Sequence, residues 1–199
     1  MSEEKIIPEV CIATSVCPEP WRWTCYDDMA TEIEVLDFLY ALVVMLKPKV
    51  VIETGCYHGH GTEQLLWGIV DNKLGELYTC DVGWESIKIT SERILDKLGE
   101  QTYTLLQCSG LDLITQVPAP IDLAFLDSGP DEIRTNELRA LYPKLAPGGV
   151  VAIHDTGVHG FLREKYLAPV VAELDLQAIC FDTPRGLTLV RKRPTIYPI

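Results

Sequence analysis

Five short apolar segments recur along the chain, and stretches with helical spacing separate them. The segments are Val50–Ile52, Leu77–Cys80, Tyr103–Gln107, Ile121–Leu126 and Val150–Ile153. Continuous apolar runs of this length are typical of strands that are covered on both faces. Because strands that alternate with helices fold into a parallel sheet between two helical layers, the recurrence predicts an α/β protein.

Helix signals fill the stretches between these strands. Thr31 and Glu34 have the spacing of a capping box, and Pro48 ends the helix that they would start. The remaining helices are expected at Thr62–Val70, Ser86–Leu98, Leu111–Thr115, Asp131–Leu145 and Phe161–Leu174.

The end of the chain breaks this alternation. Leu176–Phe181 and Leu187–Arg191 are apolar segments that flank a turn, with no helix between them. Two strands joined in this way run antiparallel. We therefore expect a Rossmann-like sheet of seven strands, mostly parallel with one antiparallel strand, and helices on both faces.

The length of 199 residues suits one domain with a sizeable core. Residues 1–30 are expected to form an irregular N-terminal segment, because prolines interrupt it. Its aromatic side chains, Trp21, Trp23 and Tyr26, make it a candidate lid, although plain packing explains them equally well. Residues 31–199 are expected to form the single domain.

The composition and net charge of the chain limit the kinds of partner and compartment that we expect for it. The net charge of −12 repels phosphate backbones and argues against nucleic acid. The longest apolar run, Phe38–Leu46, is shorter than the roughly twenty residues of a membrane span. With no signal-peptide pattern at the start, the cytoplasm is the expected compartment. The seven cysteines include no Cys-x-x-Cys pair, so neither a zinc site nor a disulfide framework is indicated.

Polar side chains follow all five of the alternating strands. They are Glu53, Asp81, Ser109, Asp127, His154 and Asp155. The carboxyl ends of parallel strands meet at one edge of a sheet, and ligands of such folds bind beyond that edge. We expect these side chains to surround one binding site.

The loop after the first strand carries Gly55, Gly59 and Gly61 and precedes a helix. Its spacing, G-x-x-x-G-x-G, differs from the dinucleotide fingerprint and lacks the Gly-Lys-Ser/Thr of a phosphate loop. Glu53 would repel a phosphate and suits a ligand with an ammonium or other positive charge. S-adenosylmethionine (SAM) carries both an ammonium and a sulfonium. A turn that only packs the helix on the sheet is the alternative.

Asp81 ends the second strand, where a carboxylate can accept hydrogen bonds from both ribose hydroxyls of an adenosine. Val82 beside it is placed to pack on the adenine. Ser109 and Gly110 follow the third strand, and they either meet the adenine edge or form a turn.

From about Met29 to Arg193 these residues together resemble the class I SAM-dependent methyltransferases. The motifs are the E-x-G-x-x-x-G-x-G loop, the acid after the second strand, and LAPGGVVAIHD at the fifth strand. The resemblance implies SAM as cofactor. The residues that it assigns to SAM are Glu53, Gly55, Tyr57, Gly59, Gly61, Thr62, Asp81, Val82, Ser109, Gly110 and Asp127.

A narrower resemblance is to the small catechol-type and bacterial O-methyltransferases. In that group the acids at the positions of Asp127 and Asp155 bind a divalent metal, usually Mg²⁺, that grips the acceptor oxygens. Two positions depart from the group, because Thr156 replaces an asparagine and Pro130 replaces the lysine that serves as general base.

The missing lysine makes His154 the expected base, since a neutral imidazole accepts a proton near neutral pH. Strand alternation leaves open whether His154 or Asp155 points into the pocket. The histidines at 58, 60 and 159 are weaker candidates for the same role.

The sequence thus predicts methyl transfer from SAM to an oxygen of a small molecule, with His154, Asp127 and Asp155 at the acceptor. Two alternatives remain: a nicotinamide-dependent oxidoreductase, and a SAM-binding module without catalysis. The acceptor stays unidentified. The oligomeric state is also open, although small enzymes of this kind often form homodimers.

Overall fold

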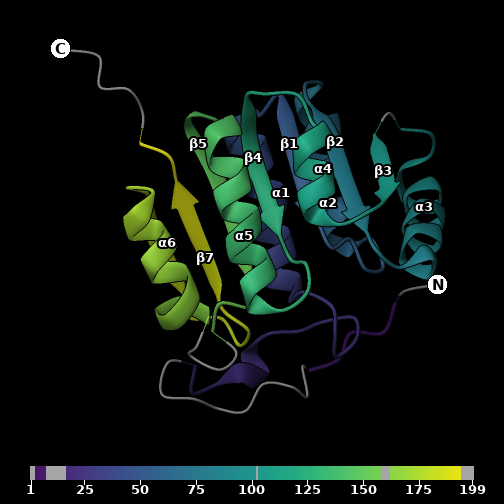
Figure 1. The fold of residues 1–199 in the computed structure, drawn as a ribbon. Coiled ribbons are helices and arrows are strands. Elements are labelled where there is room, and N and C mark those ends of the chain that lie inside the picture. The colour runs from purple at the N-terminus through teal and green to yellow at the C-terminus, as the bar shows by residue number, and fades with distance from the viewer. Residues whose placement is uncertain (1–2, 8–16, 102, 158–161, 194–199) are drawn as a thin grey trace.

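The computed structural model describes residues 3–7, 17–101, 103–157 and 162–193. Its centre is a seven-stranded sheet in the order β3-β2-β1-β4-β5-β7-β6 (Figure 1). The strands are β1 (Val50–Thr54), β2 (Glu76–Asp81), β3 (Thr104–Gln107), β4 (Ile121–Leu126), β5 (Leu145–His154), β6 (Gln177–Phe181) and β7 (Leu187–Arg191).

One strand of the sheet is antiparallel, which confirms the predicted fold. β7 pairs antiparallel with both β5 and β6, while the pairs among β1 to β5 are parallel. In Figure 1 the arrow of β7 accordingly points opposite to that of β4. The carboxyl ends of β1 to β5 therefore share one edge of the sheet.

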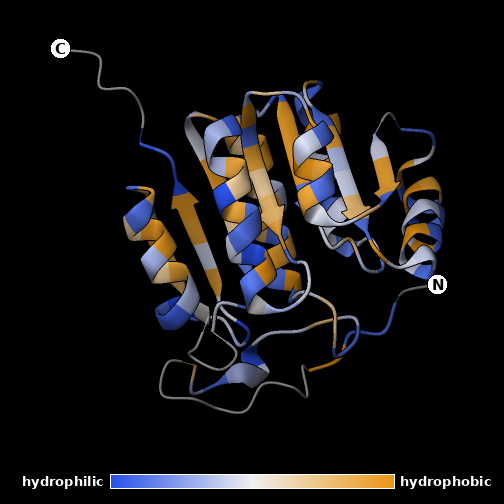
Figure 2. Cartoon of the chain, in the orientation of Figure 1, coloured by the Kyte–Doolittle hydropathy of each residue, from blue (hydrophilic) through white to orange (hydrophobic). Residues whose placement is uncertain are grey.

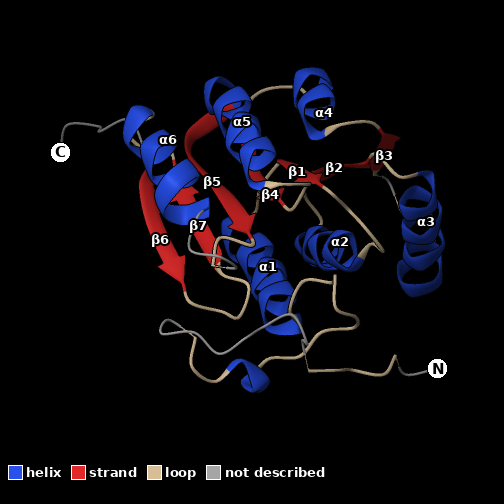
Figure 3. Cartoon of the chain, turned by 60° about the horizontal axis from the view of Figure 1, so that its bottom comes forward, coloured by secondary structure: helices blue, strands red, loops and turns tan. Residues whose placement is uncertain are grey.

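Helices cover both faces of the sheet (Figure 3). One layer holds α1 (Ile33–Leu46), α2 (His60–Asn72) and α3 (Trp84–Leu98). The other holds α4 (Gly110–Gln116), α5 (Asp131–Leu141) and α6 (Ala168–Glu173).

The core is divided by the sheet because successive strand residues point to opposite faces. Val51 packs in the core on the side of α1 and α2, and its neighbour Ile52 packs on the side of α5 and α6. Burial on both faces explains why the central strands β1 and β4 are mainly apolar, and both are largely orange in Figure 2.

Some expected boundaries were wrong. Glu32, not Thr31, is the N-cap of α1, and the helix has no side-chain cap. The Thr31 hydroxyl donates instead to Asp127, and Glu34 accepts from Thr24. A tertiary partner has therefore displaced the local capping box. β5 also begins five residues earlier than expected, at Leu145, because α5 gives way to a 3-10 turn at Tyr142–Lys144.

The described part of the N-terminal segment runs along the carboxyl edge of the sheet, below the arrowhead of β4 in Figure 1. A short bridge joins Ile6 to Cys25, and Pro20–Arg22 forms a 3-10 turn. No helix among the described residues is both long and apolar enough to cross a membrane.

Candidate active site

A cavity of about 400 Å³ opens at the carboxyl edge of the parallel strands. This volume falls within the usual range for small-molecule sites. Its lining residues come from the carboxyl ends of β1 to β5, from α4 and α5, from the N-terminal segment and from the turn before β7. They are Met29, Gly55, Tyr57, Cys80, Asp81, Val82, Cys108, Ser109, Gly110, Asp127, Ser128, Gly129, Ile133, Arg134, Glu137, Asp155 and Arg185.

The glycine loop forms the floor of this cavity. Gly55 has φ +82°, and a Cβ there would lie 2.6 Å from the carbonyl oxygen of Asp127. Glycine is therefore required for the loop after β1 to approach the loop after β4. Tyr57 follows in the left-handed region at φ 45° and lines the cavity.

Asp81 ties the loops after β1 and β2 together. Its two carboxylate oxygens accept hydrogen bonds from the backbone N–H groups of Tyr57 (3.0 Å) and Gly83 (2.8 Å). Because a carboxylate oxygen has more than one lone pair, Asp81 can still accept from a ligand. Val82, which is 72% exposed, continues the cavity wall beyond it.

Ser109 caps the helix that follows it and also lines the cavity. Its side chain caps α4 by accepting from the backbone N–H of Asp112, and it also donates to the Asp112 carboxylate. Ser109 and Gly110 nevertheless line the cavity, so a helix cap also forms part of the wall.

Glu53 lies inside the protein, behind the glycine loop. It is 1% exposed and accepts hydrogen bonds from the hydroxyls of Thr62 (2.5 Å) and Thr79 (2.6 Å). Burial raises the pKa of Glu53 to about 7, against the opposing effect of these two hydrogen bonds. A Cβ at Gly61 would collide with the Glu53 carboxylate, which explains the third glycine of the motif. Of the eleven residues expected to contact SAM, Glu53, Gly59, Gly61 and Thr62 do not line the cavity.

His154 is held between two carboxylates and is fully buried. Its Nδ1 lies 3.0 Å from Asp127 Oδ1, and its Nε2 lies 2.6 Å from Glu32 Oε2. Burial alone would lower the pKa of His154, but Asp127, Asp155 and Glu32 outweigh it and raise that pKa to about 10. The imidazole is therefore charged at neutral pH and has no free lone pair with which to accept a proton.

Asp155 forms ion pairs with two arginines. Arg185 donates from Nε to Oδ1 (2.6 Å) and from Nη2 to Oδ2 (3.0 Å), and Arg134 donates to Oδ2 (3.1 Å). Burial tends to raise the pKa of Asp155, but the charges of His154 and the two arginines lower it below its usual range.

The N-terminal segment borders the part of the cavity where Asp127 and Asp155 lie. Met29 lines the cavity, and Thr31 donates to Asp127 Oδ2 at 2.8 Å. Arg185 Nη1 donates to the carbonyl oxygens of Met29 and Ala30. The residues of this segment thus reach the acids that follow β4 and β5.

The other candidate bases lie away from the cavity. His60 is buried under Tyr26, with ring centroids 4.2 Å apart, and burial lowers its pKa to about 4. His58 stacks on Tyr57 and faces Asp27. Neither side chain lines the cavity, and residue 159 is outside the described residues.

Four charged residues at this site were missed from the sequence: Glu32, Arg134, Glu137 and Arg185. Glu137 is buried, accepts from Thr54 and Ser128, and has a pKa raised by burial. The sequence did contain a signal for Arg134 and Glu137, because helical spacing places them on the same face as the buried Leu138 and Leu141. Glu32 and Arg185 lie in irregular segments and gave no such signal.

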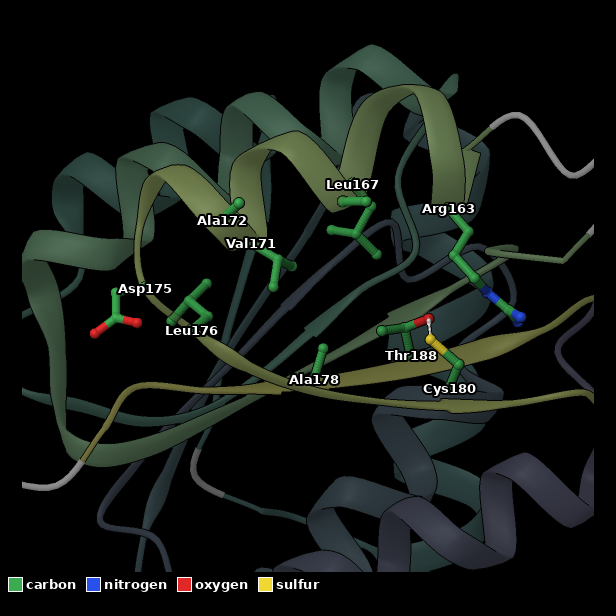
Figure 4. A pocket seen from close by; sticks show the side chains of 10 residues that line it. Arg163, Leu167, Val171, Ala172, Asp175, Leu176, Ala178, Cys180 and Thr188 are labelled. Atoms are coloured by element: carbon green, nitrogen blue, oxygen red, sulfur yellow. Dashed lines mark hydrogen bonds between the residues drawn. The ribbon is translucent and has the colours of Figure 1, made fainter.

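A second cavity, of about 230 Å³, lies between α6 and the strands β6 and β7 (Figure 4). Its walls are mainly apolar, with Leu167, Val171 and Leu176 pointing into it. It shares no lining residue with the first cavity.

A divalent metal was expected at Asp127 and Asp155, and the geometry brings suitable atoms together. Asp127, His154 and Asp155 each place one ligand atom within 4.8 Å of the others. However, both ring nitrogens of His154 face carboxylates, and Arg185 grips both oxygens of Asp155. Mg²⁺ favours oxygen ligands in octahedral geometry. Since two arginines already hold one of the two acids, these residues do not fit Mg²⁺.

A Rossmann-like sheet with β7 antiparallel is the fold that this chain shares with solved methyltransferase structures. A family model described as a methyltransferase domain matches residues 52–156, which is more than half of the 199 residues. The chain therefore belongs to this methyltransferase family. No curated protein matches the sequence.

Solved structures share the fold at low identity. The SAH-bound methyltransferase PaMTH1 of Podospora anserina has a TM-score of 0.70 at 16% identity, with 83% of this chain and 81% of that chain covered. The O-methyltransferase TomG of Streptomyces achromogenes, solved with SAM, has a TM-score of 0.67 at 16% identity, with 83% and 82% covered. An rRNA methylase of Streptococcus thermophilus has a TM-score of 0.61 at 19% identity, with 78% and 95% covered. Since these acceptors differ in class, the fold does not decide the acceptor.

Proposed function

We propose that this methyltransferase moves the methyl group of SAM to an oxygen of a small molecule. The observation that carries the proposal is one cavity that Gly55 and Asp81 line together with Asp127. The first pair suits an adenosylated, positively charged cofactor, and Asp127 offers a carboxylate to an acceptor hydroxyl. TomG and a Bacillus cereus protein that shares the fold, both O-methyltransferases, support this choice of acceptor.

In this proposal SAM lies along the carboxyl ends of β1 and β2. Asp81 accepts hydrogen bonds from the ribose hydroxyls, while Val82, Ser109 and Gly110 border the adenine. Gly55 and Tyr57 line the methionine portion. Four residues shape the glycine loop from behind the cavity wall, because none of them lines the cavity: Glu53, Gly59, Gly61 and Thr62.

Asp127 is the proposed acceptor-facing base. Its side chain is 17% exposed and lines the cavity, whereas its partners His154 and Glu32 are completely buried. Both nitrogens of His154 are engaged with carboxylates, so His154 positions Asp127 and does not itself take the acceptor proton. The contact of His154 Nδ1 with Asp127 Oδ1 also holds the Asp127 side chain in place.

The reaction is an in-line displacement at the sulfonium methyl. The acceptor oxygen forms a bond to the methyl carbon as the bond from carbon to sulfur breaks, and a neutral thioether leaves. The acceptor proton passes to Asp127 and then to solvent. Alignment of donor and acceptor supplies much of the rate gain, and removal of the proton supplies the rest. No step is assigned to a metal, because the acids do not fit Mg²⁺.

The two alternatives make different predictions in a binding experiment. Calorimetry with SAM, S-adenosylhomocysteine and NAD tests the cofactor: the proposal expects binding of the first two and no binding of NAD. Asp81→Ala should weaken the binding of SAM, while Glu76→Ala, in the same strand but exposed, should not. Tight binding of NAD alone would support the oxidoreductase.

The acceptor requires a separate experiment. Transfer of a labelled methyl group to a panel of hydroxyl and carboxyl compounds, with amines and thiols as the contrast, tests for oxygen acceptors. Binding of SAM without turnover on any compound would favour the non-catalytic module. Methylation of amines alone would contradict the choice of oxygen.

A further inference from the structure

The acceptor end of the cavity already contains its own cations. Arg185 binds Asp155 through two parallel N–H···O contacts, from Nε to Oδ1 and from Nη2 to Oδ2. A bidentate guanidinium–carboxylate pair is among the stronger polar contacts in proteins. Arg185 is 12% exposed and Asp155 is 16% exposed, so water screens the pair only partly.

Glu32, Asp127 and Asp155 each already have a cation beside them. Glu32 and Asp127 lie against His154, and Asp155 lies against Arg134 and Arg185. Each ring nitrogen of His154 lies at hydrogen-bond distance from a carboxylate oxygen, which favours an N–H on both. A divalent ion at Asp127 and Asp155 would have to displace these cations or lie beside them.

We propose that the guanidinium of Arg185 occupies the place that a divalent metal takes in related enzymes, so that this methyltransferase works without one. This inference deepens the proposed function, and the catalytic role that it gives to Arg185 rests on that function. Arg185 is then a positioning residue: it fixes Asp155 at the acceptor end of the cavity and does not itself react.

The other end of the same guanidinium explains why an arginine suits this place. Arg185 Nη1 donates to the carbonyl oxygens of Met29 (3.0 Å) and Ala30 (3.2 Å). The backbone N–H of Arg185 also donates to the buried Glu32 at 2.8 Å. One side chain thus joins the acid after β5 to the N-terminal segment over the cavity. A lysine has no planar fork and could not make the same set of contacts.

Titration of the purified chain with MnCl2 alone tests the inference, with binding followed by electron paramagnetic resonance and by calorimetry. Mn²⁺ stands in for Mg²⁺ because it takes similar oxygen ligands and is visible in the resonance spectrum. The wild-type chain should bind Mn²⁺ no tighter than about 1 mM, the weak end of the range for hard cations in proteins. Arg185→Met should bind one Mn²⁺ at least about tenfold tighter, since Asp155 then loses its bidentate partner and keeps only the single contact from Arg134.

Two matched variants complete the design. Arg139→Met removes an exposed arginine that pairs with Glu173 and should leave Mn²⁺ binding as in the wild type. The double variant Arg185→Met, Asp155→Asn should lose the gained site, because it removes one of the carboxylates. If Arg185→Met fails to fold, the wild-type titration alone decides the matter.

Stoichiometric binding of Mn²⁺ to the wild-type chain, lost in Asp155→Asn, would overturn the inference. So would a folded Arg185→Met chain that gains no affinity for Mn²⁺. The titration contains neither SAM nor an acceptor, so its failure leaves the proposed function standing. Conversely, a chain that fails to bind SAM in calorimetry contradicts the proposed function without bearing on Mn²⁺ binding.

Discussion

Replacing Glu53 by glutamine should change how the stability of the protein depends on pH. The folded chain keeps a proton on Glu53 up to about pH 7, while the unfolded chain releases it near 4.5. Between these values the folded state binds more protons than the unfolded state. The contribution of Glu53 to stability is therefore fully present below pH 4.5 and is lost as pH rises through 7.

The magnitude follows from the difference between the two pKa values. Between pH 5 and pH 8 the wild-type chain should lose about 2 to 3 kcal/mol of unfolding free energy through Glu53 alone. Glutamine keeps the size and an acceptor oxygen for Thr62 and Thr79 but carries no charge. The stability of Glu53→Gln relative to wild type should therefore rise by about that amount from pH 5 to pH 8.

Urea denaturation of both proteins at several pH values between 5 and 8 measures the effect. Glu92→Gln, which removes the same charge from the exposed side of α3, controls for the change in net charge. A stability difference that stays constant across this range would refute the burial argument.

If Glu53 instead contacts the ammonium of SAM, Glu53→Gln should weaken SAM binding by about tenfold or more, as loss of a charged partner does.

Three further predictions concern the cavity and its support. Asp81→Ala should weaken SAM binding at least about tenfold in calorimetry, because charge-assisted hydrogen bonds to the ribose are lost. Asp127→Asn should lower kcat about 100-fold or more at saturating SAM, since the acceptor proton then has no carboxylate to take it; an unchanged kcat would exclude Asp127 as the base. Glu32→Ala should lower the unfolding free energy by about 3 to 5 kcal/mol, because it leaves His154 charged and buried beside one partner fewer. In the same urea assay Glu34→Ala, at an exposed neighbouring position, should cost less than about 1 kcal/mol; equal losses for both would contradict the buried pair.

The fold could be predicted from the sequence because its signals are local. Each buried strand is a short apolar run, and each helix between them shows apolar side chains at helical spacing. The antiparallel pairing of β6 with β7 followed from the short turn before Leu187, which leaves no room for a crossover helix, whereas the pairing of β7 with β5 came only from the structure. Gly55 directly follows β1 and Asp81 ends β2, and both line the cavity at the carboxyl edge of the sheet.

The direction of each side chain depended on tertiary contacts. Glu53 lies within β1 and His154 ends β5. The structure buries Glu53 under the hydroxyls of Thr62 and Thr79. It holds His154 between Asp127 and Glu32. One-residue changes of position along a strand reverse the face that a side chain takes, and spacing alone does not fix which face meets the cavity.

The sequence by itself therefore determined the order of the elements, the edge of the sheet that binds ligands, and the glycine loop on that edge. The tertiary structure decided which charges meet there. Arg185 and Glu32 are 153 residues apart, and their contact with each other and with the acids after β4 and β5 exists only once the sheet has formed. Periodicity records the burial of neighbours within one element, whereas ion pairs between irregular segments depend on how distant elements pack.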